Sequence, residues 1–207
     1  MANMMIVIGI SGKKRAGKDT AAQIMRAKAL ASGFTVVRRA LADLLKEECA
    51  TAISEEADHY DLSYENVLKE MNTDGVKEKY RLLLQWWGTQ FRRHMCGEDY
   101  WIRAMRLWIE CHTISNEMMQ PGHPSPKQMI LIPDIRFPNE VEMVKQLGGF
   151  VIRLNRPETD SVADTHISEC ALDDFTEWDG IIWNREGLDV LRESIHYWLD
   201  NKRGLKL

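Results

Sequence analysis

Cysteine is scarce in this sequence: four cysteines occur among 207 residues, and none of them belongs to a C-x-x-C pair. The positions Cys49, Cys96, Cys111 and Cys170 match no common zinc site, even where a histidine lies close by. This pattern excludes a disulfide-based scaffold and argues against a structural zinc ion. We expect buried, reduced thiols, as in cytoplasmic proteins.

Long apolar runs and an excess of basic residues are also missing. No apolar run approaches the length of about 20 residues that a transmembrane helix needs, and residues 1–10 lack the basic region and cleavage site of a signal peptide. The formal net charge is −4, whereas nucleic-acid-binding domains are usually basic. We therefore expect a cytoplasmic protein that binds no membrane and forms no stable complex with nucleic acid.

Apolar segments of the right length for a packed α/β core are present. Hydrophobic residues make up 44% of the chain, and no linker divides it, so we expect one domain over residues 1–207. Strands are predicted over 4–10, 34–38, 129–132, 150–154 and 180–183, and helices over 18–31, 138–147 and 186–201. This order predicts a doubly wound parallel sheet of about five strands. Residues 41–118 carry no strand signal and are predicted to form a helical region.

The most specific motif, GKKRAGKDT at residues 12–20, follows the first strand and opens the first helix. It fits the G-x-x-x-x-G-K pattern of a phosphate-binding loop. Gly12 and Gly17 allow backbone angles that point successive N–H groups at a phosphate, and the helix start adds a partial positive charge. Lys18 would bridge the β- and γ-phosphates of ATP and stabilise the transferred group. The predicted ATP phosphate contacts are Gly12, Arg15, Ala16, Gly17, Lys18 and Thr20.

The residue after the lysine departs from the usual pattern. It is commonly Ser or Thr, whose hydroxyl binds Mg²⁺, but it is Asp19 here. A carboxylate at this place would hold Mg²⁺ directly, hold it through water, or serve the acceptor, and the sequence leaves these three roles open.

A second group of polar residues is predicted at the carboxyl ends of later strands, where ligands gather in open α/β sheets. Asp134 follows the strand over 129–132, where an acid would hold Mg²⁺, and Arg136 would clamp a phosphate. A helix cap and a surface arginine explain the same two residues equally well. Arg153 lies at the end of the next strand and Arg156 three residues further on, at the start of a polar loop over about 155–168 that would act as a lid. His166 is expected to cap the next turn rather than to bind a metal.

The clearest helix of the region without strands runs over residues 77–94. Its apolar stripe contains Tyr80, Leu83, Leu84, Trp87 and Phe91, and its other side carries Arg81, Gln85, Gly88 and Arg92. A glycine among these polar residues would let a ligand approach the helix closely. The pattern by itself favours the alternative, a solvated face on which the glycine has no special role.

With these segments in view, the chain resembles the phage-type deoxynucleoside monophosphate kinases. The resemblance rests on Ser11–Thr20, Leu41–Lys46, Leu84–Thr89, Asp99–Trp101, Ile132–Glu140, Gly148–Pro157, His166–Glu169 and Asn184. It implies a P-loop kinase fold, ATP as donor, Mg²⁺, deoxynucleoside diphosphates as products, and host cytoplasm as the location if a phage encodes the chain. An aspartate at position 19 is then expected, because the family's loop carries one.

The same resemblance implies roles for individual residues. Region 41–118 becomes the acceptor-binding region, in which Trp87 or Trp86 would stack on a base and Gln85 would hydrogen-bond it. Candidate acceptor contacts are Lys14, Lys46, Gln85, Trp87, Arg92, Arg93 and Glu140; the catalytic candidates are Lys18, Arg136, Asp134 and Asp19; and the metal candidates are Asp19 and Asp134. The chain is short for the family, which leaves base selectivity open.

Several alternatives remain at this point. The acceptor would be another phosphate-bearing small molecule, as in phosphomevalonate and dephospho-coenzyme A kinases, or a modified base in DNA, although the net charge of −4 argues against DNA. A nucleotide-binding switch module without kinase activity is an alternative of another class. The seven tryptophans suit a homodimer interface as well as a core.

Overall fold

The computed structural model describes residues 5–56, 62–119, 127–157, 166–202 and 205. Within them the chain forms two compact units, Leu41–Thr113 and the residues that precede and follow it. The larger unit holds five parallel strands, β1 (Met5–Ser11), β2 (Thr35–Arg38), β3 (Gln128–Ile135), β4 (Phe150–Asn155) and β5 (Gly180–Trp183). Their order in the sheet is β2-β3-β1-β4-β5, so the first strand lies at the centre.

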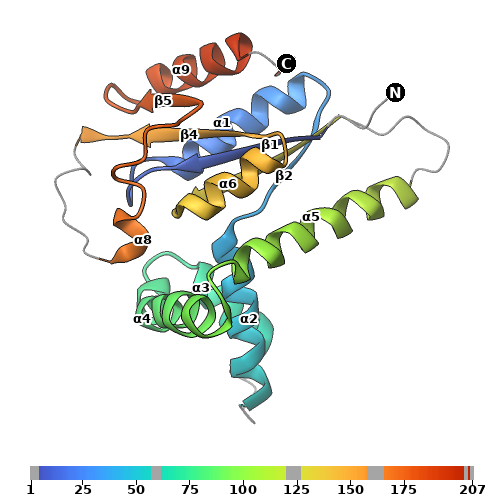
Figure 1. The fold of residues 1–207 in the computed structure, drawn as a ribbon, viewed down its shortest axis with the longest axis vertical. Coiled ribbons are helices and arrows are strands. Elements are labelled where there is room, and N and C mark those ends of the chain that lie inside the picture. Colours follow the sequence, from blue (N-terminus) through green and yellow to red (C-terminus); the bar gives the residue numbers. More distant parts are fainter. Residues whose placement is uncertain (1–4, 57–61, 120–126, 158–165, 203–204, 206–207) are drawn as a thin grey trace. The chain divides into compact units, whose positions relative to one another are not determined.

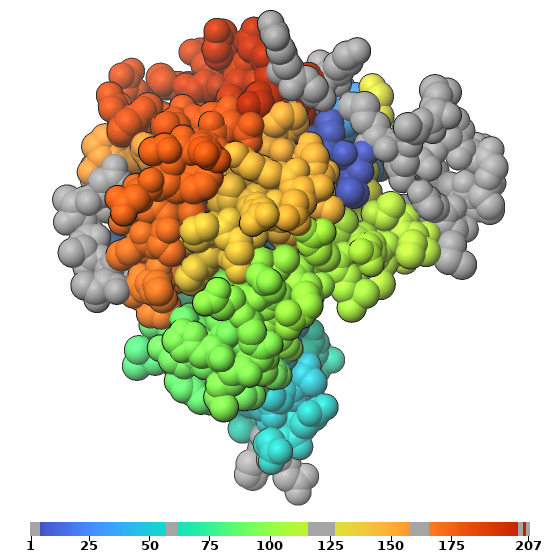
Figure 2. Space-filling view, in the orientation of Figure 1, coloured from blue at the N-terminus to red at the C-terminus, as the bar shows by residue number. Residues whose placement is uncertain are grey.

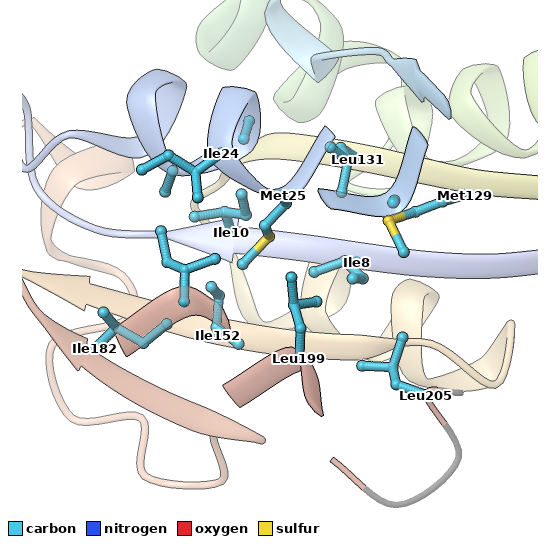
Figure 3. Close-up of a cluster of buried hydrophobic side chains, with 14 of the residues drawn as sticks. Ile8, Ile10, Ile24, Met25, Met129, Leu131, Ile152, Ile182, Leu199 and Leu205 are labelled. Atoms are coloured by element: carbon cyan, nitrogen blue, oxygen red, sulfur yellow. The ribbon is translucent and has the colours of Figure 1, made fainter. Parts of the chain in front are cut away.

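Helices cover both faces of this sheet (Figure 1). These helices are α1 (Lys18–Ala31), α6 (Pro138–Gln146) and α9 (Leu188–Asn201). A short helix, α8 (Ile167–Cys170), lies between β4 and β5 in the chain. Ile8 and Ile10 point to the face that α1 and α9 cover, where they join Met25 and Leu199 in one core cluster (Figure 3). Gly9 points to the opposite face, because a Cβ there would lie 3.3 Å from Val144 of α6.

The predicted strands and helices of this unit are confirmed within two residues at their ends, with one exception. β3 was expected to end at residue 132 but continues through Pro133 to Ile135 and pairs with β1 as far as Ser11. Asp134 therefore belongs to the strand and does not follow it. Proline lacks an N–H donor and is usually confined to sheet edges or irregularities, and the register of β1 against β3 shifts between Gly9 and Ser11.

The described residues of the smaller unit form helices and no strand, as predicted for this region. These helices are α2 (Leu41–Glu56), α3 (Tyr64–Asn72), the 3₁₀-helix η2 (Lys77–Tyr80), α4 (Arg81–Gln85), the π-helix η3 (Trp86–Met95) and the part of α5 (Tyr100–Met119) up to Thr113. Their core gathers Cys49, Ala50, Val67 and Met71, against which Tyr80, Leu84 and Trp87 of the predicted apolar stripe pack.

Two expectations for this unit are corrected. The single α-helix predicted over 77–94 is three successive segments, of which η3 has the wider π turn. Gly88 lies neither on a solvated face nor in a ligand's path: it is buried, a Cβ there would lie 3.1 Å from a methyl group of Leu45, and its carbonyl accepts a hydrogen bond from Trp101 Nε1 at 3.0 Å. The glycine permits close packing between helices.

The cysteines also differ in part from expectation. Cys49 is buried, but Cys96, Cys111 and Cys170 are exposed, because they lie at helix ends or on outward-facing helix positions. In the described part of the chain no three His, Cys, Asp or Glu side chains come together as metal ligands. None of the described helices combines the length and the hydropathy needed to cross a membrane.

Candidate active site

The loop between β1 and α1 has a backbone that two glycines make possible. Gly12 and Gly17 have φ angles of 153° and 97°, a region that residues with a Cβ rarely adopt. A Cβ at Gly12 would lie 2.5 Å from the Leu154 carbonyl oxygen, and one at Gly17 would lie 2.8 Å from Asn184 Nδ2. Between them Arg15 also has a positive φ, 66°. The loop is therefore a tight turn pressed against the end of β4, with the first helix beginning directly after it.

Asn184, which directly follows β5, hydrogen-bonds the backbone of this loop. Its side-chain Nδ2 donates to the carbonyl oxygen of Ala16 at 3.0 Å, while its own N–H donates to Asn155 at 2.8 Å. Asn184 was among the residues that carry the family resemblance, but no role in the site was predicted for it. Its position directly after a parallel strand is the signal that would have found it.

Lys18 lies at the centre of the loop. Its Nζ donates to the carbonyl oxygens of Gly12 at 2.7 Å and of Lys13 at 2.8 Å. Burial, and secondly the nearby charge of Arg136, lower the pKa of Lys18 to about 8, although Glu169, Asp134 and Asp19 oppose the shift. A phosphate in the loop would raise this pKa again, because an anion stabilises the ammonium.

Both predicted metal ligands lie close enough to Lys18 to act on its charge. Asp134 is half-buried on β3, and Asp19 is exposed in the first turn of α1, where it pairs with Arg38 at 2.8 Å. Mg²⁺ prefers oxygen ligands and is commonly held by one or two carboxylates while it keeps several waters. Two carboxylates beside a phosphate loop fit this chemistry.

Arg136 is held by the turn that carries it and by α8. Its N–H donates to Glu140 Oε2 at 2.7 Å, and the next N–H, of Phe137, donates to the same oxygen at 3.2 Å. Its guanidinium Nη1 pairs with the Glu169 carboxylate and contacts the Ser168 carbonyl at 3.4 Å. Glu140, 3% exposed, thus fixes the backbone of the arginine turn, and its predicted contact with the acceptor stays a prediction.

Two further cationic side chains, those of Lys13 and Arg153, contact residues 169–173 in and after α8. Lys13 Nζ donates to the Glu169 carbonyl at 2.7 Å and pairs with Asp173, which Arg153 Nη2 approaches at 3.5 Å. In the space-filling view this orange segment lies beside the yellow atoms of α6 (Figure 2), where Lys145 Nζ donates to the Glu177 carbonyl at 2.8 Å.

The cap predicted for His166 is confirmed, since its Nδ1 accepts from the Ser168 N–H at 3.2 Å. The lid predicted over about 155–168 falls largely on residues 158–165, which lie outside the described residues. Arg156, half-buried just after β4, precedes them. Its lid role and that of Arg153 therefore stay predictions.

In the smaller unit, Glu48 of α2 collects three donors. Its carboxylate accepts from Trp87 Nε1 at 2.7 Å, Arg92 Nε at 2.5 Å and Tyr100 OH at 2.6 Å. The Arg92 guanidinium lies over the rings of Phe91 and Tyr100, at 4.5 and 4.9 Å. Burial, and then the hydrogen bond to Glu48, raise the pKa of Tyr100 to about 12. Neither Glu48 nor Tyr100 was predicted, and Glu48 carries no local signal because its partners lie about 40 to 50 residues away along the chain.

Two other predicted acceptor residues of this unit have hydrogen-bond partners outside the Glu48 cluster. Arg93 is 6% exposed and donates to the Glu98 carbonyl at 3.0 Å, while Lys46 donates to Asn72 Oδ1 at 2.8 Å. Gln85 is half-buried, whereas Lys14 of the phosphate loop is exposed. Trp86, rather than Trp87, presents an exposed ring: it is 51% exposed and stacks on Phe91 at 5.6 Å with an interplanar angle of 6°.

Comparisons with known proteins agree with these features. A family model described as deoxynucleotide monophosphate kinase matches residues 63–195. A protein of Acanthamoeba polyphaga mimivirus that is provisionally named a deoxynucleotide monophosphate kinase is 28% identical over 205 residues, which covers 95% of this chain and 97% of the relative. A phosphomevalonate kinase of Drosophila melanogaster is also 28% identical, over 95% of this chain and 96% of its own length.

Among solved structures, the APS kinase of Mycobacterium tuberculosis aligns over 97% of this chain and all of its own, with a TM-score of 0.45 and 10% identity. A second structure of that kinase, in complex with AMPPNP and APS, gives a TM-score of 0.44. At these scores the likeness bears on neither substrate nor mechanism. The resemblance inferred from the sequence motifs is confirmed by the family match, which covers well over half of the chain. The parallel sheet with its glycine loop is the predicted α/β fold of a P-loop kinase, and the chain is a nucleoside monophosphate kinase that belongs to the deoxynucleotide monophosphate kinase family.

Proposed function

We propose that this kinase transfers the γ-phosphoryl group of ATP, with Mg²⁺, directly to the phosphate of a deoxynucleoside monophosphate. The products would be ADP and a deoxynucleoside diphosphate. The observation that carries the proposal is the glycine loop over residues 12–17, against which Lys18 Nζ is held 2.7 and 2.8 Å from two loop carbonyls. An ammonium held there suits the bridging of β- and γ-phosphates.

The donor phosphates would be bound by the loop itself. Its backbone N–H groups and the start of α1 supply donors and partial positive charge, with contacts from Gly12, Arg15, Ala16, Gly17 and Thr20. Asp19 and Asp134 would hold Mg²⁺ directly or through water, and the ion would neutralise charge that develops on the phosphate oxygens.

Activation of the acceptor phosphate depends on a positively charged side chain such as arginine more than on a general base that removes a proton. Its attacking group is already an anionic phosphate oxygen, so no proton has to be removed, and catalysis depends on position and charge. Arg136 is proposed to bind this phosphate or the transferring group, because its guanidinium lies close enough to Lys18 to lower the lysine's pKa. In-line attack then breaks the bond between the γ-phosphorus and the bridging oxygen and leaves ADP.

The base and sugar of the acceptor are proposed to bind the helical unit. The proposed contacts in this unit are Lys46, Gln85, Trp87, Arg92 and Arg93. Lys14 and Glu140 are proposed acceptor contacts outside it. Since the Trp87 indole is engaged by Glu48, we place stacking on a base at the exposed ring of Trp86 as an alternative to Trp87.

A second acceptor class has a specific observation behind it. The Drosophila phosphomevalonate kinase has the same identity to this chain, 28%, as the mimivirus relative. The acceptor could then be a phosphorylated small molecule without a base.

The test is ADP release, coupled to a spectrophotometric assay, with ATP, Mg²⁺ and each of dAMP, dGMP, dCMP, dTMP, 5-hydroxymethyl-dCMP and phosphomevalonate. We expect turnover that requires a deoxynucleoside monophosphate and falls on the order of 10²–10³-fold in Lys18→Ala. Lys28→Ala is the matched control, because Lys28 lies in the last turn of the same helix and pairs with Asp200 at 2.6 Å, away from the loop. Turnover with phosphomevalonate alone would establish the second acceptor class, and slow ADP release indifferent to every acceptor would indicate a switch module.

A further inference from the structure

The segment His166–Glu169 has no part in the reaction as proposed above, yet it contacts two cations of the phosphate site. The Glu169 carboxylate pairs with Arg136 Nη1, and the carbonyl of Ser168 lies 3.4 Å from the same nitrogen. The Glu169 carbonyl accepts from Lys13 Nζ at 2.7 Å. A four-residue helix therefore contacts both the glycine loop and the arginine that follows β3.

The burial of this ion pair shows which partner is fixed. The side chain of Glu169 is 8% exposed, whereas that of Arg136 is 31% exposed. His166 Nδ1 fixes the start of α8 through the Ser168 N–H, and Lys13 holds its main chain. The carboxylate is thus presented to the arginine by an anchored backbone.

We propose, on the basis of the proposed function, that Glu169 is a positioning residue that holds the Arg136 guanidinium in the orientation in which it binds the phosphate. A carboxylate that pairs with one end of a guanidinium fixes the plane of the whole group. The arginine side chain is then already oriented before the transition state, because the folded protein has ordered it in advance.

The opposite role for Glu169, as a competitor that phosphate must displace, fits the structure less well. Displacement would leave a carboxylate that is 8% exposed without its charged partner, which is costly inside a protein. The two roles also predict opposite kinetics. A positioning residue raises kcat, whereas a competitor weakens substrate binding, so its removal would lower KM.

The test is a double-mutant cycle between Glu169 and Arg136, read as kcat and KM with the best deoxynucleoside monophosphate. Glu169→Gln is expected to lower kcat roughly 10- to 100-fold and to change the KM values for ATP and acceptor less than about twofold. In an Arg136→Ala background the same substitution should have little further effect on kcat, because the proposed role of Glu169 is exerted through the arginine. Asp174→Asn is the control, because this exposed carboxylate lies five residues after Glu169 in the chain, and the variant should retain full kcat.

The outcomes separate cleanly. If Glu169→Gln lowers kcat equally with and without Arg136, or lowers KM while kcat holds, the positioning role is wrong. Should Glu169→Gln not fold, as judged by circular dichroism, Glu169→Asp replaces it in the cycle, and additive losses count against the proposal in the same way. Absence of acceptor-dependent ADP release in the wild-type protein would instead overturn the proposed function, and the role of Glu169 with it.

Discussion

Lys18 shows how a single residue of the glycine loop is tuned by its surroundings. An unperturbed lysine has a pKa of 10.5, but burial and the charge of Arg136 lower it to about 8 here. The loop carbonyls of Gly12 and Lys13 accept hydrogen bonds from the ammonium without adding a full negative charge. The residue is therefore charged at neutral pH and close to losing its proton just above it.

This pKa predicts how binding of the nucleotide depends on pH. Lys18 attracts the phosphates only when it is protonated, so the affinity for ATP without metal should fall as the pH rises above about 8. The limiting loss is about tenfold per pH unit, because one proton is bound together with the ligand. Titration calorimetry at several values between about pH 7 and 9.5 measures the slope. A lysine of ordinary pKa would show no fall in this range.

The matched variant for this experiment is Lys18→Met, which removes the charge and keeps much of the side-chain volume. Its weaker affinity should not change with pH over the same range. An equal slope in the wild type and in this variant would assign the pH dependence to another group.

At the scale of helices and strands, the parts of the structure that the sequence predicts are those with local signals. A buried parallel strand is a continuous apolar run, and a loop that needs two positive φ angles shows glycine at both places, as at Gly12 and Gly17. The strands, helices and phosphate loop of the larger unit follow from such patterns. Asp134 was placed after its strand because Pro133 resembles a strand end, although β3 continues to Ile135.

The contacts that sequence reasoning missed depend on residues far apart in the chain. Glu48 is one acid among several in α2, and nothing nearby indicates that Trp87, Arg92 and Tyr100 will donate to it. The π turn of η3 was missed as well, because a 3.6-residue repeat was assumed. The apolar stripe remained informative because Tyr80, Leu84 and Trp87 still pack on the core of the helical unit.

The Glu48 cluster predicts different effects for the two adjacent tryptophans. Trp87→Phe removes the donor at 2.7 Å from Glu48 and should lower the free energy of unfolding by about 1.5–3 kcal/mol, the cost of a hydrogen bond to a charged group. Trp86→Phe is the matched control, because the Trp86 ring is 51% exposed, and it should change stability by less than about 0.5 kcal/mol. Urea unfolding followed by circular dichroism measures both. Equal losses would contradict a structural role specific to the Trp87 indole.

At the scale of the whole molecule, the chain has two compact units with separate cores. The phosphate loop, Asp134 and Arg136 belong to one, and the Glu48 cluster belongs to the other. The proposed reaction divides in the same way, with the donor phosphates assigned to the first unit and the acceptor base to the second. Because the two units have separate cores, we expect each unit to unfold locally with its own equilibrium constant.

The four cysteines provide a probe of the helical unit within the intact protein. Cys96, Cys111 and Cys170 are exposed, whereas Cys49 lies in the core of that unit. Burial, and secondly the charge of Glu48, raise the pKa of the Cys49 thiol to about 12. A thiolate is the reactive form, so Cys49 is protected both by its low accessibility and by its low ionisation.

We therefore expect an aromatic disulfide reagent at pH 8 to titrate three thiols rapidly in the native protein and the fourth only as residues 41–113 open. In urea high enough to unfold the chain, all four should react at similar rates. A Cys49→Ala variant should show three thiols under both conditions, which assigns the slow thiol. The rate of the slow phase, measured against urea concentration, then reports the free energy of opening of the helical unit. Rapid reaction of all four thiols in native protein would show that the core around Cys49 and Met71 is not closed.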